Sequence, residues 1–363
     1  MCSEHPLFVG LMTGTSLDGI DAVLAHPGPP FRILAHHSAT LPMALRASLQ
    51  SLLLPGDNEI ERAGPAHRWL GQCYANATRE LLRQAGVRAD RVTAIGCHGQ
   101  TIRHRPGDGG FSLQLGCADT LASETGIAVV NDFRNKDMVL GGQGAPLAPR
   151  FHQSLLSQPD ERRVILNLGG IANVTLLDGE RLVGGFDTGP ANTLLDQWYR
   201  QHQSGEFDTN GAWANSGRVL PELLERLLDD DYFHLPAPKS TGREYFNLPW
   251  LHTFLNGGET PRDVQATLAE LTARAIAIAL REFAPARVLV CGGGAHNQYL
   301  LARLADQVGK PVESTAPWGV PPEQVEAAAF AWLAWAYWHR VPGNAPAVTG
   351  ACREAILGHL TLP

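Results

Sequence analysis

Short apolar runs recur along the first half of the chain, and most of them end at glycine or at small polar residues. Runs bounded in this way predict β-strands. The predicted strands are Leu7–Met12, Ile20–Ala25, Phe31–Ala35, Val92–Cys97 and Ile127–Asn131. Apolar positions at helical spacing predict helices over 58–84 and 118–125, with Gly86 as a stop just beyond the first of these.

The second half repeats the same order of patterns. Predicted strands cover Val164–Leu168, Ile171–Leu177, Leu182–Phe186 and Arg287–Val290. Predicted helices cover Ala191–His202, Pro261–Phe283, Asn297–Val308 and Pro321–His339. Strands that alternate with helices in this way indicate an α/β fold.

Each half opens with a strand, a glycine turn and a second strand. We expect two similar α/β domains that face each other across a cleft, although two unrelated hairpins would give the same pattern. The glycine-rich segment Gly141–Pro146, or the helix after it, marks the predicted boundary. The predicted domains are therefore residues 1–150 and 151–363.

Composition narrows the class of protein. The 363 residues carry a net charge of −7, which does not favour a nucleic-acid partner or an anionic membrane surface. The first ten residues do not show the pattern of a signal peptide. The longest apolar run, Ala327–Trp338, is shorter than the roughly 18 residues of a membrane span. The six cysteines form no C-x-x-C pair, so we expect reduced thiols and a cytoplasmic protein.

The glycine turns are candidate phosphate sites. The chain has no P-loop motif and no G-x-G-x-x-G motif between a strand and a helix. The turn Gly14–Gly19 offers backbone amides to an anion, and Thr15 and Ser16 add hydroxyl donors. Asp18 and Asp21 add carboxylates suited to Mg²⁺. An ordinary hairpin turn is the competing interpretation.

Two further segments end predicted strands. Asp187 follows an apolar run and precedes Thr188-Gly189-Pro190, where a carboxylate can act as a general base. Its competing role is to cap the next helix. The three glycines Gly292–Gly294 carry no side chains, so a flat ring or a ribose could lie against their backbone. A loose turn between a strand and a helix is the competing interpretation.

Polar side chains suited to a small ligand follow other strands. His98 and Gln100 follow one strand, and Asp132 and Arg134 follow another. An imidazole, an amide, a carboxylate and a guanidinium suit a polyhydroxylated or carboxylated ligand, although each residue alone has a structural interpretation. Glu326, in the last predicted helix, is either a ligand contact or a solvated charge.

Several of these motifs resemble the anhydro-N-acetylmuramic acid kinases. The resemblance runs in order over nearly the whole chain. It is carried by Gly10–Asp21, Cys97–Thr101, Asp132–Arg134, Gly141–Pro146, Asn167–Asn173, Gly185–Pro190, Gly292–Gly294 and Glu326.

The resemblance implies an actin-like sugar kinase fold, in which two α/β domains flank a nucleotide cleft. It also implies a reaction in which 1,6-anhydro-N-acetylmuramic acid, ATP and water give N-acetylmuramic acid 6-phosphate and ADP during peptidoglycan recycling. The family commonly forms homodimers. ATP and Mg²⁺ are the implied cofactors, with Asp18 holding the metal directly or through water.

The resemblance also implies a role for individual residues. Asp187 matches the catalytic base. The implied ATP and phosphate residues are Gly14, Thr15, Ser16, Leu17, Asp18, Gly19, Asn167, Gly169, Gly170, Gly292, Gly293, Gly294 and Asn297. The implied substrate residues are His98, Gln100, Asp132, Arg134, Asn173 and Glu326.

Two other functions stay open at this point. A kinase for another anhydro sugar, such as levoglucosan, would use the same phosphate turns and Asp187 without a pocket for N-acetyl and lactyl groups. An actin- or chaperone-like ATPase is a different class, but the sequence has no appended peptide-binding domain.

Overall fold

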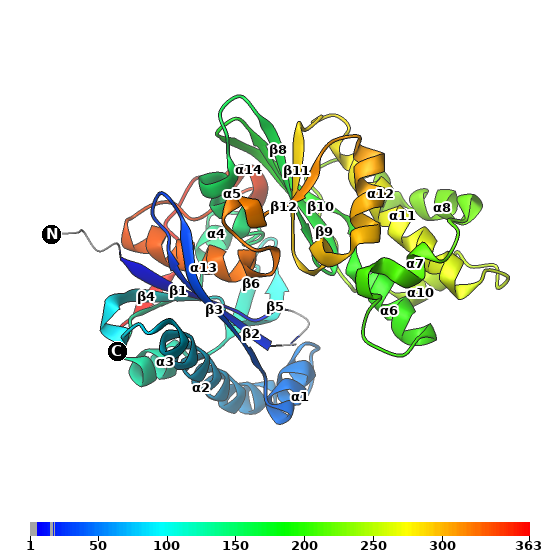
Figure 1. Ribbon diagram of the computed structural model, residues 1–363. Coiled ribbons are helices and arrows are strands. Elements are labelled where there is room, and N and C mark those ends of the chain that lie inside the picture. The colour runs from blue at the N-terminus through cyan, green and yellow to red at the C-terminus, as the bar shows by residue number, and fades with distance from the viewer. Residues whose placement is uncertain (1–5, 15–16, 18) are drawn as a thin grey trace. The chain divides into compact units, whose positions relative to one another are not determined.

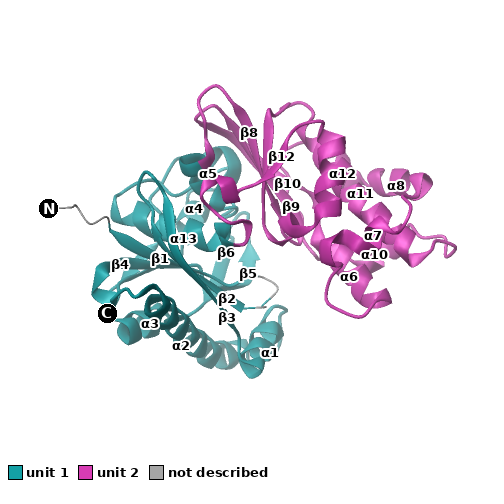
Figure 2. Cartoon of the chain, viewed as in Figure 1, with its two compact units in different colours: residues 1–155, 324–363 teal, residues 156–323 magenta. Residues whose placement is uncertain are grey.

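The computed structural model describes residues 6–14, 17 and 19–363, and divides the chain into two compact units (Figures 1 and 2). Unit 1 contains residues 1–155 together with 324–363. Unit 2 contains residues 156–323. Each unit is built on its own mixed β-sheet.

The sheet of unit 1 begins as an antiparallel meander and continues with parallel strands. The strand Leu7–Met12 pairs antiparallel with Gly19–His26 on one side and parallel with Val92–Cys97 on the other. In spatial order the strands are β13 (His359–Thr361), β7 (Val129–Asn131), β4 (Val92–Cys97), β1 (Leu7–Met12), β2 (Gly19–His26) and β3 (Arg32–Thr40). A separate hairpin joins β5 (Gln100–Arg105) to β6 (Phe111–Leu115).

Helices cover both faces of this sheet. Val9 and Leu11 point to the face that packs against α2 (Glu59–Ala85). Gly10 points to the other face, where α13 (Val325–Trp338) crosses β1 and β4. A Cβ atom at Gly10 or Gly96 would overlap backbone atoms of α13, so glycine permits this close approach.

The remaining helices of unit 1 are short, the longest being α1 with 10 residues. They are α1 (Met43–Leu52), α3 (Ala118–Thr125), α4 (Asn135–Val139), α5 (Ala148–Leu156) and α14 (Pro346–Thr349), with a 3-10 turn, η1 (Ala89–Arg91). The first unit boundary falls at the end of α5, just beyond the glycine-rich segment that predicted it.

The placement of residues 324–363 differs from the predicted division, which assigned them to the second domain. In the structure α13 packs on β1, β2 and β4, and β13 extends the same sheet beside β7. Because α13 is apolar around most of its circumference, its sequence indicates a buried helix but not which sheet it covers.

The sheet of unit 2 repeats the plan of unit 1. The first three strands of this unit form an antiparallel meander. The next strand along the chain pairs parallel with the first of them. The spatial order is β10 (Arg181–Pro190), β9 (Ile171–Asp178), β8 (Arg162–Leu168), β11 (Arg287–Cys291) and β12 (Val312–Ser314). The prediction of an α/β fold with two similar halves is confirmed.

Unit 2 is largely helical outside its sheet. Val164 and Leu166 share one core with Leu268 and Leu271. The helices are α6 (Asn192–His202), α7 (Ala212–Asn215), α8 (Pro221–Leu228), α9 (Asp231–His234), α10 (Leu248–His252), α11 (Pro261–Leu280) and α12 (Gln298–Val308). Short 3-10 segments are η2 (Thr209–Gly211), η3 (Gly293–His296), η4 (Ala316–Trp318) and η5 (Pro322–Gln324). Within the described residues, no helix combines the length and apolar character required to cross a bilayer.

Candidate active site

The first glycine turn connects β1 to β2 in unit 1. The amide of Leu17 donates to the carbonyl oxygen of Gly14 at 3.1 Å, which closes a tight turn. At the end of the turn, a Cβ on Gly19 would lie 2.6 Å from the carbonyl oxygen of Ala39, so β3 passes too close for any side chain. The candidate phosphate and metal residues Thr15, Ser16 and Asp18 lie outside the described residues.

The His98 side chain is buried at the end of β4 and is held by Arg134. The Nη2 and Nε atoms of Arg134 lie 2.8 and 3.2 Å from His98 Nε2, and its Nη1 donates to the carbonyl oxygen of Gly144 at 2.7 Å. Burial and the adjacent guanidinium hold the pKa of His98 well below its ordinary value. The imidazole is therefore neutral, and accepting from Arg134 at Nε2 places its proton on Nδ1.

Two buried polar atoms lie unpaired near the start of the β5 hairpin. Among the described residues, Gln100 Oε1 has no hydrogen-bond partner, while its Nε2 donates to the carbonyl oxygen of Thr101 at 3.1 Å. His98 Nδ1 is close to the backbone of Gly99 but makes no hydrogen bond of normal geometry with the described part of the chain. One donor and one acceptor thus remain for a polar ligand.

Charged groups surround the same end of unit 1. Burial lowers the pKa of Arg134 to about 10, and the Glu326 carboxylate opposes this shift. Glu326 lies exposed in the first turn of α13. Asp21 accepts a hydrogen bond from Ser38 at 2.6 Å, and its carboxylate is 3.5 Å from His36.

Asp132 has protein partners of its own. One carboxylate oxygen accepts from Asn135 Nδ2 at 2.7 Å, and the other is 3.3 Å from the ring of His359. These contacts fix the start of α4, which immediately follows Arg134. In the structure Asp132 therefore supports the segment that carries the guanidinium.

In unit 2, three predicted site residues form a row across neighbouring strands. Asn167 of β8 is opposite Asn173 of β9, which is opposite Asp187 of β10. Directly opposite residues point to the same face of a sheet, with Cβ atoms roughly 4.5–5.5 Å apart. Asp187 lies within β10, because the strand continues to Pro190 beyond its predicted end at Phe186.

Asp187 is held by the loop that follows α9. Its Oδ2 accepts from the amide of Thr241 at 3.0 Å, and its own amide donates to the carbonyl oxygen of Lys239 at 3.0 Å. Burial raises the pKa of Asp187 to about 6, against the lowering effect of the Thr241 amide, and the Glu244 carboxylate adds to the rise. The cap of α6 is Ala191, so the competing role of Asp187 as a helix cap is not observed.

The second glycine turn is anchored on α6. The carbonyl oxygen of Gly169 accepts from the amide of Asn192, and that of Gly170 accepts from Ala191 and Thr193, each at 3.0 Å. The first amides of α6 are thereby occupied by the turn itself. An anion at this turn would therefore be bound by the N–H groups of the turn, which point away from α6.

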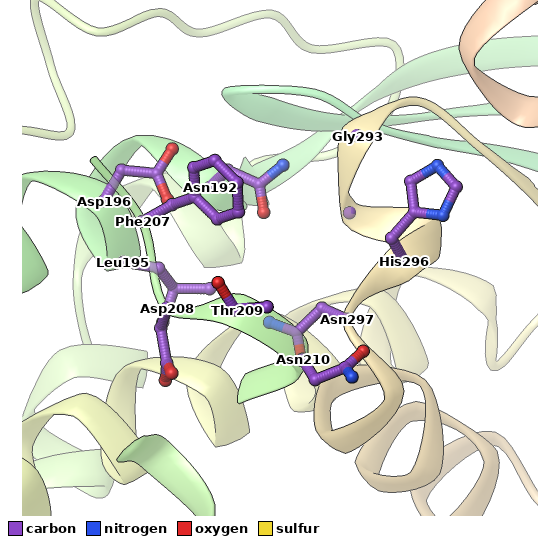
Figure 3. Close-up of a pocket in the computed structure, with 11 residues that line it drawn as sticks. Asn192, Leu195, Asp196, Phe207, Asp208, Thr209, Asn210, Gly293, His296 and Asn297 are labelled. Carbon is purple, nitrogen blue, oxygen red and sulfur yellow. The ribbon is translucent and has the colours of Figure 1, made fainter. Parts of the chain in front are cut away.

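A pocket of about 400 Å³ opens within unit 2 (Figure 3). Predicted nucleotide residues Gly293, Gly294 and Asn297 line it, with η3 on one side and Phe207 opposite. Gly292 has a φ of 80°, and a Cβ there would overlap Asn167 Oδ1. The remaining lining residues are Asn192, Leu195, Asp196, Asp208, Thr209, Asn210 and His296.

A comparison with known protein families identifies the family of the chain. The family model described as anhydro-N-acetylmuramic acid kinase matches residues 6–363. The chain belongs to this family. The resemblance in the motifs is thereby confirmed, and family membership identifies the chain as a kinase.

Curated relatives extend the match over nearly the whole chain. The anhydro-N-acetylmuramic acid kinase of Shewanella halifaxensis is 51% identical over 363 residues, covering 98% of each chain. The anhydro-N-acetylmuramic acid kinase of Bordetella petrii is also 51% identical and covers 98% of this chain and 96% of its own.

A solved structure supports the fold. The activator of the 2-hydroxyisocaproyl-CoA dehydratase from Clostridium difficile, with bound ADPNP, matches with a TM-score of 0.50 at 12% identity. The match covers 92% of this chain and 96% of that one. At this identity the likeness concerns the fold alone. The chain has the two-domain fold of actin-like ATPases and sugar kinases.

Some residues of the candidate site are not predicted by the sequence. Phe207 and Asp208 lie in an irregular segment, where no periodicity identifies a pocket. Lys239 and Thr241 reach Asp187 through backbone atoms, so their side-chain types carry no signal of that contact. The sequence of 207–211 offers only an aromatic residue followed three positions later by an Asn-Gly pair.

The described residues do not assemble a metal centre by themselves. No group of three or more His, Cys, Asp or Glu side chains that could hold an ion is found among them. The candidate ligand Asp18 is outside the part of the chain that the structure describes. No step of the reaction is therefore assigned to a metal ion.

Proposed function

We propose that the protein cleaves the 1,6-anhydro bond of 1,6-anhydro-N-acetylmuramic acid and phosphorylates O6 with ATP, releasing N-acetylmuramic acid 6-phosphate and ADP. The observation that carries the proposal is Asp187, a partly buried carboxylate whose pKa is raised to about 6. A base with a pKa near neutrality accepts a proton efficiently and is still ionised at pH 7. The family to which the chain belongs supplies the sugar.

The chemistry requires one base that acts on water. O6 of the anhydro sugar is an ether oxygen and has no proton to lose. In the proposed reaction water attacks C1 while Asp187 accepts its proton, and the C1–O6 bond breaks. O6 takes the bonding electrons and attacks the γ-phosphorus of ATP, from which ADP leaves. One water is consumed, C1 gains a hydroxyl group and O6 gains the phosphoryl group.

We assign sugar recognition to His98, Gln100, Arg134 and Glu326, with Asn173 beside the base. The unpaired donor at His98 Nδ1 and the unpaired acceptor at Gln100 Oε1 suit hydroxyl or amide groups. Arg134 uses three of its five N–H groups within the protein, which leaves two for the lactyl carboxylate. We assign Asp132 a positioning role, in which its contacts with Asn135 and His359 hold the segment that carries Arg134.

We assign adenosine to the pocket of unit 2. A volume of about 400 Å³ is within the usual range for small-ligand sites, roughly 300–1,000 Å³. Phe207, a residue that is 58% exposed, offers an aromatic face on which a purine can stack. Gly293 and Gly294 leave part of the opposite wall without side chains.

We assign the phosphates to the two glycine turns. Gly14, Thr15, Ser16, Leu17 and Gly19 belong to the first turn, and Gly169 and Gly170, with Asn167 beside them, belong to the second. Mg²⁺, when bound, would offset negative charge on the phosphates, with Asp18 as its proposed ligand directly or through water.

Homodimer formation and a cytoplasmic location are proposed from the family alone. The net charge of −7 supports the proposal that neither a nucleic acid nor a membrane surface is a partner.

An assay of ADP release tests the proposed function. We expect rapid release with ATP and 1,6-anhydro-N-acetylmuramic acid, and only background release without sugar. Equal turnover of levoglucosan would instead support a kinase for another anhydro sugar. Sugar-independent ATP hydrolysis would support the ATPase alternative. 1,6-Anhydro-N-acetylglucosamine, which lacks only the lactyl group, measures how far recognition depends on the carboxylate.

A further inference from the structure

We propose that Arg243 binds the phosphoryl group that is transferred, at the second glycine turn, and that the loop 239–244 thereby brings this group next to the base. The inference rests on the proposed function and adds a residue to it. Every contact that supports it lies within unit 2.

The loop is fixed at the catalytic carboxylate. The amide of Thr241 donates to Asp187 Oδ2, and Lys239 accepts from the amide of Asp187, both at 3.0 Å. Tyr232 completes the support: its hydroxyl donates to the Asp187 carbonyl oxygen at 2.7 Å, and its own carbonyl oxygen accepts from Lys239 Nζ at 2.8 Å. The position of Arg243, two residues beyond Thr241, is therefore set by the same contacts that orient the base.

The guanidinium of Arg243 lies against the second glycine turn. The point where Gly170 would carry a Cβ is 3.1 Å from Nε, 3.2 Å from Nη2 and 3.5 Å from Cζ of Arg243. Three atoms of the planar group at such similar distances indicate that its face covers the glycine. The N–H groups point along the edges of that plane and stay available for a ligand.

The turn itself presents a donor of the same kind. The C=O and N–H of a trans peptide point in opposite directions. Because the Gly169 carbonyl is bound to the amide of Asn192, the N–H of Gly170 points away from α6. A phosphate oxygen at the turn can therefore receive a backbone amide together with the guanidinium.

Two polar side chains of this loop lack partners in the described part of the protein. Among the described residues, the exposed Arg243 guanidinium has no hydrogen-bond or ion-pair partner. Thr241 Oγ1 is buried and likewise has no partner in the part of the chain described. A buried hydroxyl without a partner beside the base indicates that a ligand completes the site.

Charge explains why a cation is needed here. Asp187 and Glu244 are both acidic, and Glu244 already raises the pKa of Asp187. A phosphoryl group next to two carboxylates would be repelled unless a positive charge offset it. Arginine meets this need because its fork binds two phosphate oxygens at once.

The shared chemistry is recognition of an oxyanion, and the lactyl carboxylate of the sugar is the other possible source. The two sources predict different kinetics. A phosphate role lowers kcat and weakens ATP binding, whereas a carboxylate role raises KM for the sugar and leaves nucleotide binding unchanged.

The experiment compares wild type, R243M, R243K, R243A and R181A in the full-length protein. Arg181 begins β10, the strand that contains Asp187, and lies exposed at the opposite end, so R181A is the matched control. For R243M we expect kcat to fall about 100-fold or more, with an unchanged Tm. Adenosine binding should be retained while ATP binding weakens. R243K should recover part of kcat, and ethylguanidinium should partly rescue an R243A variant.

The outcomes separate the two claims. Wild-type kcat in R243M, or a rise confined to KM for the sugar, would overturn the assignment of Arg243 while the proposed function stands. Failure of the wild-type protein to phosphorylate the anhydro sugar would overturn the proposed function itself.

Discussion

At the scale of single residues, the proposed reaction depends on the protonation state of Asp187. Replacing it with Asn keeps the size of the side chain and the hydrogen bond from Thr241, but removes the proton acceptor. We expect Asp187→Asn to fold and bind ATP yet lose several orders of magnitude in kcat. Calorimetric titration with ATP and the ADP-release assay check this, and near-wild-type turnover would refute the assignment of the base.

The raised pKa of Asp187 gives a second prediction at this scale. Activity needs the ionised carboxylate, so kcat/KM should fall as the pH decreases through about 6. Stability should change in the opposite sense. Because folding raises this pKa above 3.8, the buried charge destabilises the folded state increasingly as the pH rises through about 6.

Asp187→Asn should therefore raise Tm at pH 8 relative to wild type, and this difference should vanish near pH 4. Melting curves across that pH range measure it. A Tm difference that is independent of pH would show that the carboxylate is not penalised by burial.

At the scale of elements, glycines decide how closely α13 approaches the sheet of unit 1. A Cβ at Gly96 would overlap the carbonyl oxygen of Phe330, which belongs to the helix backbone and cannot turn aside. We expect Gly96→Ala to destabilise the protein by about 1–3 kcal/mol or more. Gly258→Ala is the control: Gly258 lies in an exposed loop, and a methyl group there would meet no atom within 4 Å, so stability should change by less than about 1 kcal/mol. Denaturant unfolding of both variants checks the pair, and equal stabilities would contradict the packing.

The elements also show what sequence reasoning can and cannot reach. Apolar runs with glycine at their ends located β1 and β4 at their observed bounds, because both strands are buried on two faces. The β5–β6 hairpin was missed because its strands carry polar and basic residues, among them Arg103 and His104. The sequence predicts Asp187 as a base from its place after an apolar run and from the family resemblance, and the structure places it inside β10. Arg243 is not predicted, since its position depends on a fold contact with Gly170 that no local pattern records.

At the scale of the whole molecule, the chain leaves unit 1, builds unit 2 and returns. Unit 2 is one continuous segment with its own sheet and core, so the fragment 156–323 should unfold cooperatively by itself. Fragment 1–155 lacks α13 and β13, which cover and extend its sheet, and should not. Thermal melting followed by near-ultraviolet circular dichroism compares the two, and cooperative melting of 1–155 alone would contradict this division.

The most direct test of the account is the fate of water in the reaction. Turnover in ¹⁸O-labelled water, quenched early and analysed by mass spectrometry, should give a sugar phosphate with one label at C1 and none in its phosphoryl group. Unlabelled N-acetylmuramic acid 6-phosphate held in the same water corrects for exchange at C1. Label in released inorganic phosphate, or no label at C1 above that control, would contradict the coupling of anhydro-bond hydrolysis to phosphoryl transfer.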